Sequence, residues 1–190
     1  MSTESDNFFV WPTSFSCIIA LDNVLLSSDY SLSIGMLPTE VQNGSVIGLR
    51  KVKHFISKFV HQSIVIRDSH SLIPSIVPLS TNTVQLPQDP YDYFFAATLY
   101  RKLVAITKNH FTIQSITLDS SVGDRIKYHI NETCNAYDDL LNQPDSWWNQ
   151  DNVHTNYSEN FPTWEDFNIV TPTKFSPRII KGSKSEDKSI

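Results

Sequence analysis

Histidine and cysteine are the residues of this chain whose types are best suited to metal binding or nucleophilic catalysis. Zinc sites and catalytic thiolates both need partner residues at suitable separations. Cys17 and Cys134 lie far apart without a Cys-x-x-Cys spacing, and the six histidines are scattered without the spacing of a ligand set. Cys17 also lies in an apolar run, which is typical of a structural thiol. The sequence therefore predicts no metal, no cofactor and no catalytic residue.

Two aspartates offer phosphoryl chemistry as an alternative. The stretch Ile19–Leu26 resembles the first motif of the haloacid dehalogenase-like phosphatases, in which a strand ends in two Asp residues separated by one position. Asp22 matches the second Asp, the general acid of that family, whereas Ala20 stands at the position of the nucleophile. The resemblance implies a degenerate phosphohydrolase fold, because a methyl group can neither attack phosphorus nor hold Mg²⁺. An enzyme built on Asp22 would also need Asp124, which is similar to an acid of the family's metal motif, in the same cleft.

Basic side chains form a candidate site for an anion. Three of them lie on the polar face of an expected helix and three along an expected strand: Arg50, Lys51, Lys53, Arg125, Lys127 and His129. If the two faces adjoin, they can receive a phosphate or an acidic peptide. The alternative interpretation is a solvated polar face, because helices routinely carry Lys opposite their apolar stripe.

The region 132–173 combines acidic and aromatic residues and contains no Lys or Arg. Such a composition suits a segment that places aromatic anchors in a partner's groove while its acids steer the encounter. The candidate partner-binding residues are Trp147, Trp148, Phe161, Trp164 and Phe167. The alternative is that these aromatics dock on the chain's own core.

The elements that must position these residues are clearest between residues 89 and 131. Asp89 is placed to cap a helix and Pro90 suits its first position, after which apolar residues recur every three or four positions. A strand begins at Phe111, and a change in the alternation of its apolar residues predicts a β-bulge near Gln114. The segment thus reads as a helix that leads directly into a sheet.

A second strand is expected to complete a hairpin with the first. Gly123 supplies a turn with a backbone angle that other residues resist. In the second strand Ile126, Tyr128 and Ile130 alternate with the basic residues, so that one face meets the core and the other meets water.

The remaining elements precede residue 89. The apolar patterns predict strands at 15–20 and 30–36 around a polar turn at 27–29, a helix at 46–60, and short strands at 63–67 and 83–86. This order predicts an α+β fold with a mainly antiparallel sheet and two amphipathic helices on one face. Parallel pairing of strands around the helices is the rival arrangement.

Length and composition limit the organisation. The chain has 190 residues, of which 40% are hydrophobic, enough for one core. We expect an N-terminal extension at 1–13, the core domain at 14–131, the acidic aromatic segment at 132–173 and a disordered tail at 174–190. No apolar run reaches membrane-spanning length and the first residues are acidic, so we expect a cytoplasmic protein without membrane contact.

The sequence favours a non-enzymatic accessory or interaction protein with an unidentified protein partner. The acidic, Asn- and Ser-rich composition is similar to that of accessory proteins of tailed bacteriophages. The formal net charge of -5 disfavours a general nucleic-acid binder, because phosphate binding depends on an excess of Lys and Arg. A nucleic-acid-associated factor using the basic residues stays an alternative, and the oligomeric state stays open.

Overall fold

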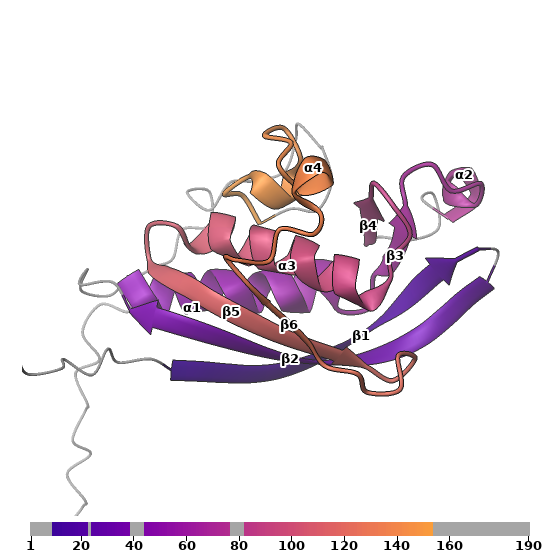
Figure 1. Ribbon diagram of the computed structural model, residues 1–190. Coiled ribbons are helices and arrows are strands. Elements are labelled where there is room, and N and C mark those ends of the chain that lie inside the picture. The colour runs from indigo at the N-terminus through magenta and orange to yellow at the C-terminus, as the bar shows by residue number, and fades with distance from the viewer. Residues whose placement is uncertain (1–8, 23, 39–43, 77–81, 154–190) are drawn as a thin grey trace, which may run out of the picture. The chain divides into compact units, whose positions relative to one another are not determined.

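The computed structural model describes residues 9–22, 24–38, 44–76 and 82–153, all within one unit of the chain (Figure 1). The strands are β1 (Phe9–Leu21), β2 (Val24–Pro38), β3 (Ile64–Arg67), β4 (Thr83–Leu86), β5 (Phe111–Ser120) and β6 (Tyr128–Asn131). The helices are α1 (Gly44–Phe55), the π-helix η1 (Ile56–Val60), α2 (Ile73–Ile76), α3 (Asp92–Thr107), α4 (Asp138–Leu141) and the 3₁₀ turn η2 (Trp147–Asn149).

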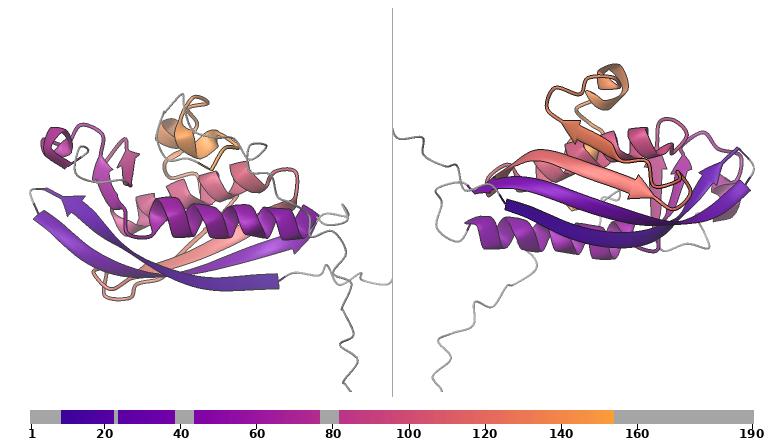
Figure 2. Two further views of the ribbon diagram at one scale, coloured as in Figure 1. Left: turned by 180° about the vertical axis from the view of Figure 1, so that it is seen from behind. Right: turned by 60° about the horizontal axis from the view of Figure 1, so that its bottom comes forward.

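The six strands form one sheet in the order β4-β3-β1-β2-β5-β6. The pairs β1/β2, β2/β5 and β5/β6 are antiparallel, whereas β1/β3 and β3/β4 are parallel. Figures 1 and 2 show α1 and α3 on the same face of this sheet. The α+β class is therefore confirmed, but the sheet is mixed, because β3 returns to pair in parallel with β1 after α1 and η1.

The long β1–β2 hairpin departs from the predicted one. Leu21 pairs with Val24, so the chain reverses between these two residues and the expected polar turn at 27–29 is part of β2. Asp22 adopts a φ of 52°, a left-handed angle that Asp tolerates better than most residues. β1 also starts at Phe9, so the expected N-terminal extension contributes its last residues to the sheet.

Alternate residues of the hairpin divide between the two faces of the sheet. Phe15 and Tyr30 are buried beneath the helices, where their rings stack at 5.1 Å between centroids. Phe95 of α3 packs against both rings edge-on, at 6.2 Å and 5.5 Å. The paired residues Ser14 and Ser31, of the opposite parity, are exposed on the face without helices.

The start of α3 lies later than predicted. The helix begins at Asp92 with Tyr91 as its N-cap residue, and no side chain caps it. Asp89 does not cap, because it lies two residues before the N-cap; its carboxylate is 4.0 Å from Arg67 and its carbonyl accepts the N–H of Tyr91. Pro90 is buried just outside the helix.

The predicted β-bulge is confirmed at Gln114. Gly35 of β2 pairs with Ser115 and Met36 pairs with Ile113, which leaves Gln114 as the extra residue of β5. The inserted residue lets Ile113 and Ile116 both face the core although they differ in parity.

The β5–β6 turn departs from the prediction in two respects. β6 begins only at Tyr128, so Ile126 lies in the connection before it and is 56% exposed. The φ of Gly123 is not positive; Asp124 and Arg125 take the left-handed angles instead. Gly123 is required for space, because a Cβ there would lie 2.3 Å from Oδ2 of Asp92. Of the helices that the structure describes, none has the length and apolar composition to cross a membrane.

Candidate functional site

The acidic aromatic segment docks on the core as far as it is described. Trp147 and Trp148 are 6% and 5% exposed, and their indole N–H groups donate to the carbonyls of Gln85 and Leu141, both at 2.9 Å. This supports docking on the chain's own core for these two rings, which leaves little of either surface for a partner. Phe161, Trp164 and Phe167 lie outside the described residues, so their partner-binding role stays a prediction.

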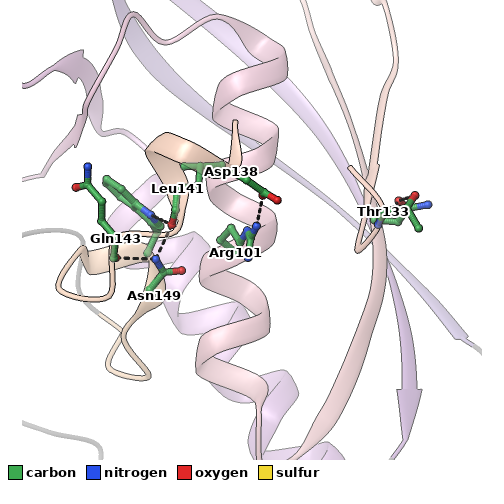
Figure 3. Close-up of polar contacts among 8 residues, drawn as sticks. Arg101, Thr133, Asp138, Leu141, Gln143 and Asn149 are labelled. Atoms are coloured by element: carbon green, nitrogen blue, oxygen red, sulfur yellow. Dashed lines mark hydrogen bonds and ion pairs between the residues drawn. The ribbon is translucent and has the colours of Figure 1, made fainter. Parts of the chain in front are cut away.

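Polar contacts hold the same segment in place (Figure 3). Arg101 of α3 donates to Asp138 at 2.5 Å, which fixes α4 beside the long helix. The amide of Asn149 donates to the carbonyls of Leu141 at 2.6 Å and Gln143 at 2.8 Å, closing the loop between α4 and η2. The segment 132–153 is therefore an integral part of the folded core.

A buried lysine forms the centre of this docking. Lys102 of α3 is 0% exposed, and its ammonium donates to the carbonyls of Trp147 at 2.6 Å and Gln150 at 3.0 Å. It also reaches Oδ1 of Asn152 at 3.3 Å and lies 5.7 Å from the centre of the Trp147 ring. Burial lowers the pKa of Lys102 to about 7, against a smaller opposing effect of Asp151. The sequence pattern gave no signal for this role, because Lys at a buried helix position is rare.

The six predicted anion-binding residues do not form one site. Arg50 and Lys53 are exposed on α1, on the helix-covered face of the sheet. His129 is exposed on the opposite face, since its neighbour Ile130 points into the core. Its Nδ1 contacts Oγ1 of Thr117 at 3.1 Å.

The other three basic residues face different surroundings. Lys51 is half-buried, and burial lowers its pKa against an opposing effect of Asp151. Arg125 forms an ion pair with Asp119 at 3.3 Å, and Lys127 is exposed. Arg125 and Lys127 lie before β6 and not along it, because the strand begins at Tyr128.

The acidic pair of the enzyme hypothesis occupies two separate turns. Asp22 lies in the β1–β2 turn, where its carbonyl contacts the imidazole of His70, and Asp124 lies in the β5–β6 turn. Within residues 9–22, 24–38, 44–76 and 82–153, no three His, Cys, Asp or Glu side chains are grouped to hold a metal ion. Neither aspartate lines the pocket at the edge of β1 or the pocket at the start of α3.

A pocket that contains one predicted residue lies at the edge of β1. Its volume is about 280 Å³, close to the lower end of the range for small-molecule sites. The right-hand view of Figure 2 shows α1 running along the β1 side of the sheet. The lining residues come from β1, α1, η1 and the turn after η1: Trp11, Thr13, Ser14, Lys53, Ile56, Ser57 and His61.

The local fold opens this edge. β1 pairs with β3 only at Ile18 and Ile19, so among the described strands its first half is paired with β2 alone. By the two-residue repeat, the backbone groups of Ser14 point to the same side as those of Ser16. Pro12 shares that side and has no N–H, which discourages pairing with a further strand.

The polar groups of the pocket can donate hydrogen bonds, and one of them carries a positive charge. The Lys53 ammonium lies 5.6 Å from the centre of the Trp11 ring, within the range of a cation–π contact. The backbone N–H of Ser16 donates to Nδ1 of His61 at 3.1 Å, so the neutral imidazole carries its proton on Nε2 and keeps a second N–H to donate. The hydroxyls of Thr13 and Ser57 complete the set, and none of the lining residues is acidic.

Sequence reasoning found only Lys53 among these residues. Trp11 lies in the expected N-terminal extension, and His61 is one of the six histidines whose spacing predicts no metal site. The neighbouring Trp11-Pro12 pair, a large aromatic beside a residue confined to edge strands, is the signal that could have extended β1 to this edge.

Comparisons with known proteins add no function. No protein-family model and no curated protein matches the chain. Among solved structures, a catalytic-residue mutant of Plasmodium vivax 6-pyruvoyltetrahydropterin synthase is similar at 15% identity and a TM-score of 0.40. The match covers 66% of this chain and 99% of that one. A similarity at this level carries no argument about activity.

Proposed function

We propose that the protein binds a small organic anion in the pocket between β1 and the α1–η1 helix, with a carboxylate or phosphate on Lys53 and a flat apolar part on Trp11. One observation carries the proposal. Lys53 is held against an indole face in a pocket whose other polar groups can donate, and within the described part of the chain no carboxylate pairs with it.

The chemistry of the lining residues supports an anion over other ligands. A cationic ligand would meet Lys53 without any acidic group to compensate. A neutral ligand would gain from Trp11 and Ile56 but would leave the ammonium without a counter-charge. An anion can take hydrogen bonds from the ammonium, the imidazole N–H and the hydroxyls together, and charge-assisted hydrogen bonds are the stronger ones.

The apolar walls of the pocket favour a ligand with a flat apolar part. Trp11 offers one wall and the Ile56 side chain contributes a second apolar surface. Aromatic ligands bury such surface and stack on an indole face. This binding role differs from the protein-partner role expected from the sequence, which stays a prediction.

The test is a calorimetric titration with benzoate and phenyl phosphate as probes, each compared with a neutral counterpart, benzamide or phenol. We expect both anions to bind and the neutral compounds to bind at least about tenfold more weakly. Inorganic phosphate separates the charge from the ring, and we expect it to bind more weakly than phenyl phosphate.

Two lysine variants locate the site. Lys53→Met removes the ammonium from the pocket, and we expect the affinity for benzoate to fall about tenfold. Lys58→Met is the matched control, because Lys58 is an exposed lysine of η1 that does not line the pocket. Equal losses in the two variants, or equal binding of benzoate and benzamide, would contradict the proposal.

A further inference from the structure

A second pocket, of about 240 Å³, has the opposite chemistry. It lies between the start of α3 and the loop that joins β5 to β6. Figure 1 shows this loop below the N-terminal end of α3. The walls are largely aromatic and apolar, with Tyr91 and Tyr93 from the start of α3, Tyr128 from β6 and Ile19 from β1. Its only ionisable groups are the tyrosines and one carboxylate, that of Asp92.

The charge of Asp92 has no cationic partner in the described part of the chain. Its two oxygens accept hydrogen bonds from neutral hydroxyls, Oδ1 from Tyr30 at 3.2 Å and Oδ2 from Ser120 at 2.5 Å. These bonds orient the carboxylate without neutralising it. Arg125, in the same turn as Gly123, is paired with Asp119 instead.

The groups behind Asp92 stay neutral as well. Burial, and to a smaller extent the Asp92 carboxylate itself, raise the pKa of the Cys17 thiol to about 12. Burial likewise raises the pKa of Tyr30. Apart from the partial positive charge of the α3 N-terminus, a cation can therefore reach Asp92 from the side of the pocket.

The tyrosine rings suit a particular kind of cation. Tyr93 and Tyr128 both line the pocket and contact each other edge to face, at 5.8 Å between centroids and 64°, while Tyr93 also packs against Tyr137 at 5.5 Å. Tyr91 is 58% exposed and adds a third ring at the mouth. Aromatic faces attract cations, and a bulky organic ammonium also buries its methyl groups against them. A small hydrated metal ion gains nothing from such walls.

We propose that this pocket binds an organic ammonium group, with its charge on Asp92 and its alkyl groups on Tyr91, Tyr93 and Tyr128. The site is independent of the anion pocket, which lies at the β1 edge beside α1. The positive end of the α3 helix dipole would by itself favour an anion. The carboxylate of Asp92, in the first turn, already interacts favourably with that end.

The test uses choline as the probe and 3,3-dimethylbutan-1-ol, its uncharged carbon counterpart, as the matched control ligand. In NMR titrations at constant ionic strength, we expect choline to shift the amide signals of residues in the first turn of α3 and in the β5–β6 turn. The alcohol should bind at least about fivefold more weakly, as expected for loss of a cation–π contact. Equal binding of the two compounds, or no binding of choline, would overturn the proposal.

Three variants separate the charge from the rings. Asp92→Asn keeps the size of the side chain, and we expect choline affinity to fall about tenfold. Because that variant also alters the contacts of Tyr30 and Ser120, Tyr91→Ala provides a second test at an exposed position, with Tyr91→Phe as its control. Tyr91→Phe should keep the affinity within about twofold, since the aromatic face remains, whereas Tyr91→Ala should lower it several-fold.

A tethered cation gives a test that does not depend on removing contacts. Val122 lines the pocket and is 41% exposed, so Val122→Lys can place an ammonium at the mouth without disturbing the core. We expect this variant to lose choline binding while Val122→Gln retains it. Retention of choline binding in both would show that the cation is bound elsewhere.

Discussion

Lys102→Met is the most informative change to the folded core. Methionine has a similar length and can fill the space, but it cannot donate to the carbonyls of Trp147 and Gln150 or to Asn152. A buried acceptor left without a donor costs about 1 to 3 kcal/mol. In the variant, water can satisfy part of the acceptors that Lys102 no longer reaches. We therefore expect the free energy of unfolding to fall by about 3 kcal/mol under conditions in which the wild-type amine is neutral.

The pH dependence of this effect follows from the lowered pKa. Lys102 has a folded-state pKa of about 7 against an ordinary value of 10.5, so between these values the unfolded chain binds more protons than the folded one. Stability therefore rises with pH in this window, and linkage gives a gain of about 2 kcal/mol between pH 7 and pH 9. Lys102→Met loses this gain. Its destabilisation should thus be only about 1 kcal/mol at pH 7, growing to about 3 kcal/mol at pH 9.

The assay is urea denaturation of both proteins at the two pH values, with Lys108→Met as the control. Lys108 is an exposed lysine at the end of α3, and its replacement should change stability by less than about 0.5 kcal/mol at either pH. A Lys102→Met protein whose stability differs from wild type by the same amount at pH 7 and pH 9 would refute the reasoning about the buried amine.

Three further changes test the strand register, the β5–β6 turn and the acidic aromatic segment. In thermal denaturation, deleting Gln114 should lower the free energy of unfolding by less than about 1 kcal/mol, because it removes only the bulge residue. Deleting Thr117 should prevent folding or lower it by about 3 kcal/mol, because Leu118 would turn out of the core. Equal losses in the two variants would disprove the register. Gly123→Ala should destabilise the fold by about 1 to 3 kcal/mol through its 2.3 Å approach to Asp92, and a second substitution, Asp92→Ala, should remove most of that penalty. A chain that ends after Val153 should lose any protein partner bound through Phe161, Trp164 and Phe167, and retained binding would refute the role predicted for these three residues.

The elements that the sequence predicts well are those whose signal is local. The helical periodicity of α3 and the parity change around Gln114 depend on side chains a few positions apart. The helix and the bulge both appear in the structure, although α3 is buried on more than one side and not along a single stripe. The sequence did not predict the helix boundary at α3, because contacts with distant residues decide where that helix begins. Asp89 could cap a helix in isolation, but Arg67 and the backbone of Tyr91 engage it instead.

The candidate sites depend on contacts that no local pattern contains. Lys53 and Trp11 are separated by most of a hairpin and a helix, and they meet only because α1 runs beside β1. Gly123 was correctly singled out but for the wrong reason, since its φ is ordinary and its small size is what the neighbouring Asp92 requires. Spatial neighbours from distant segments decide both cases.

The most direct measurement of the proposed function is the set of intermolecular nuclear Overhauser effects between phenyl phosphate and the protein. The account predicts effects from the phenyl protons to the indole of Trp11 and to the side chain of Ile56, with both lost in Lys53→Met and kept in Lys58→Met. Effects confined to the surface around Arg125 and Lys127, or effects at Trp11 that persist without Lys53, would contradict it.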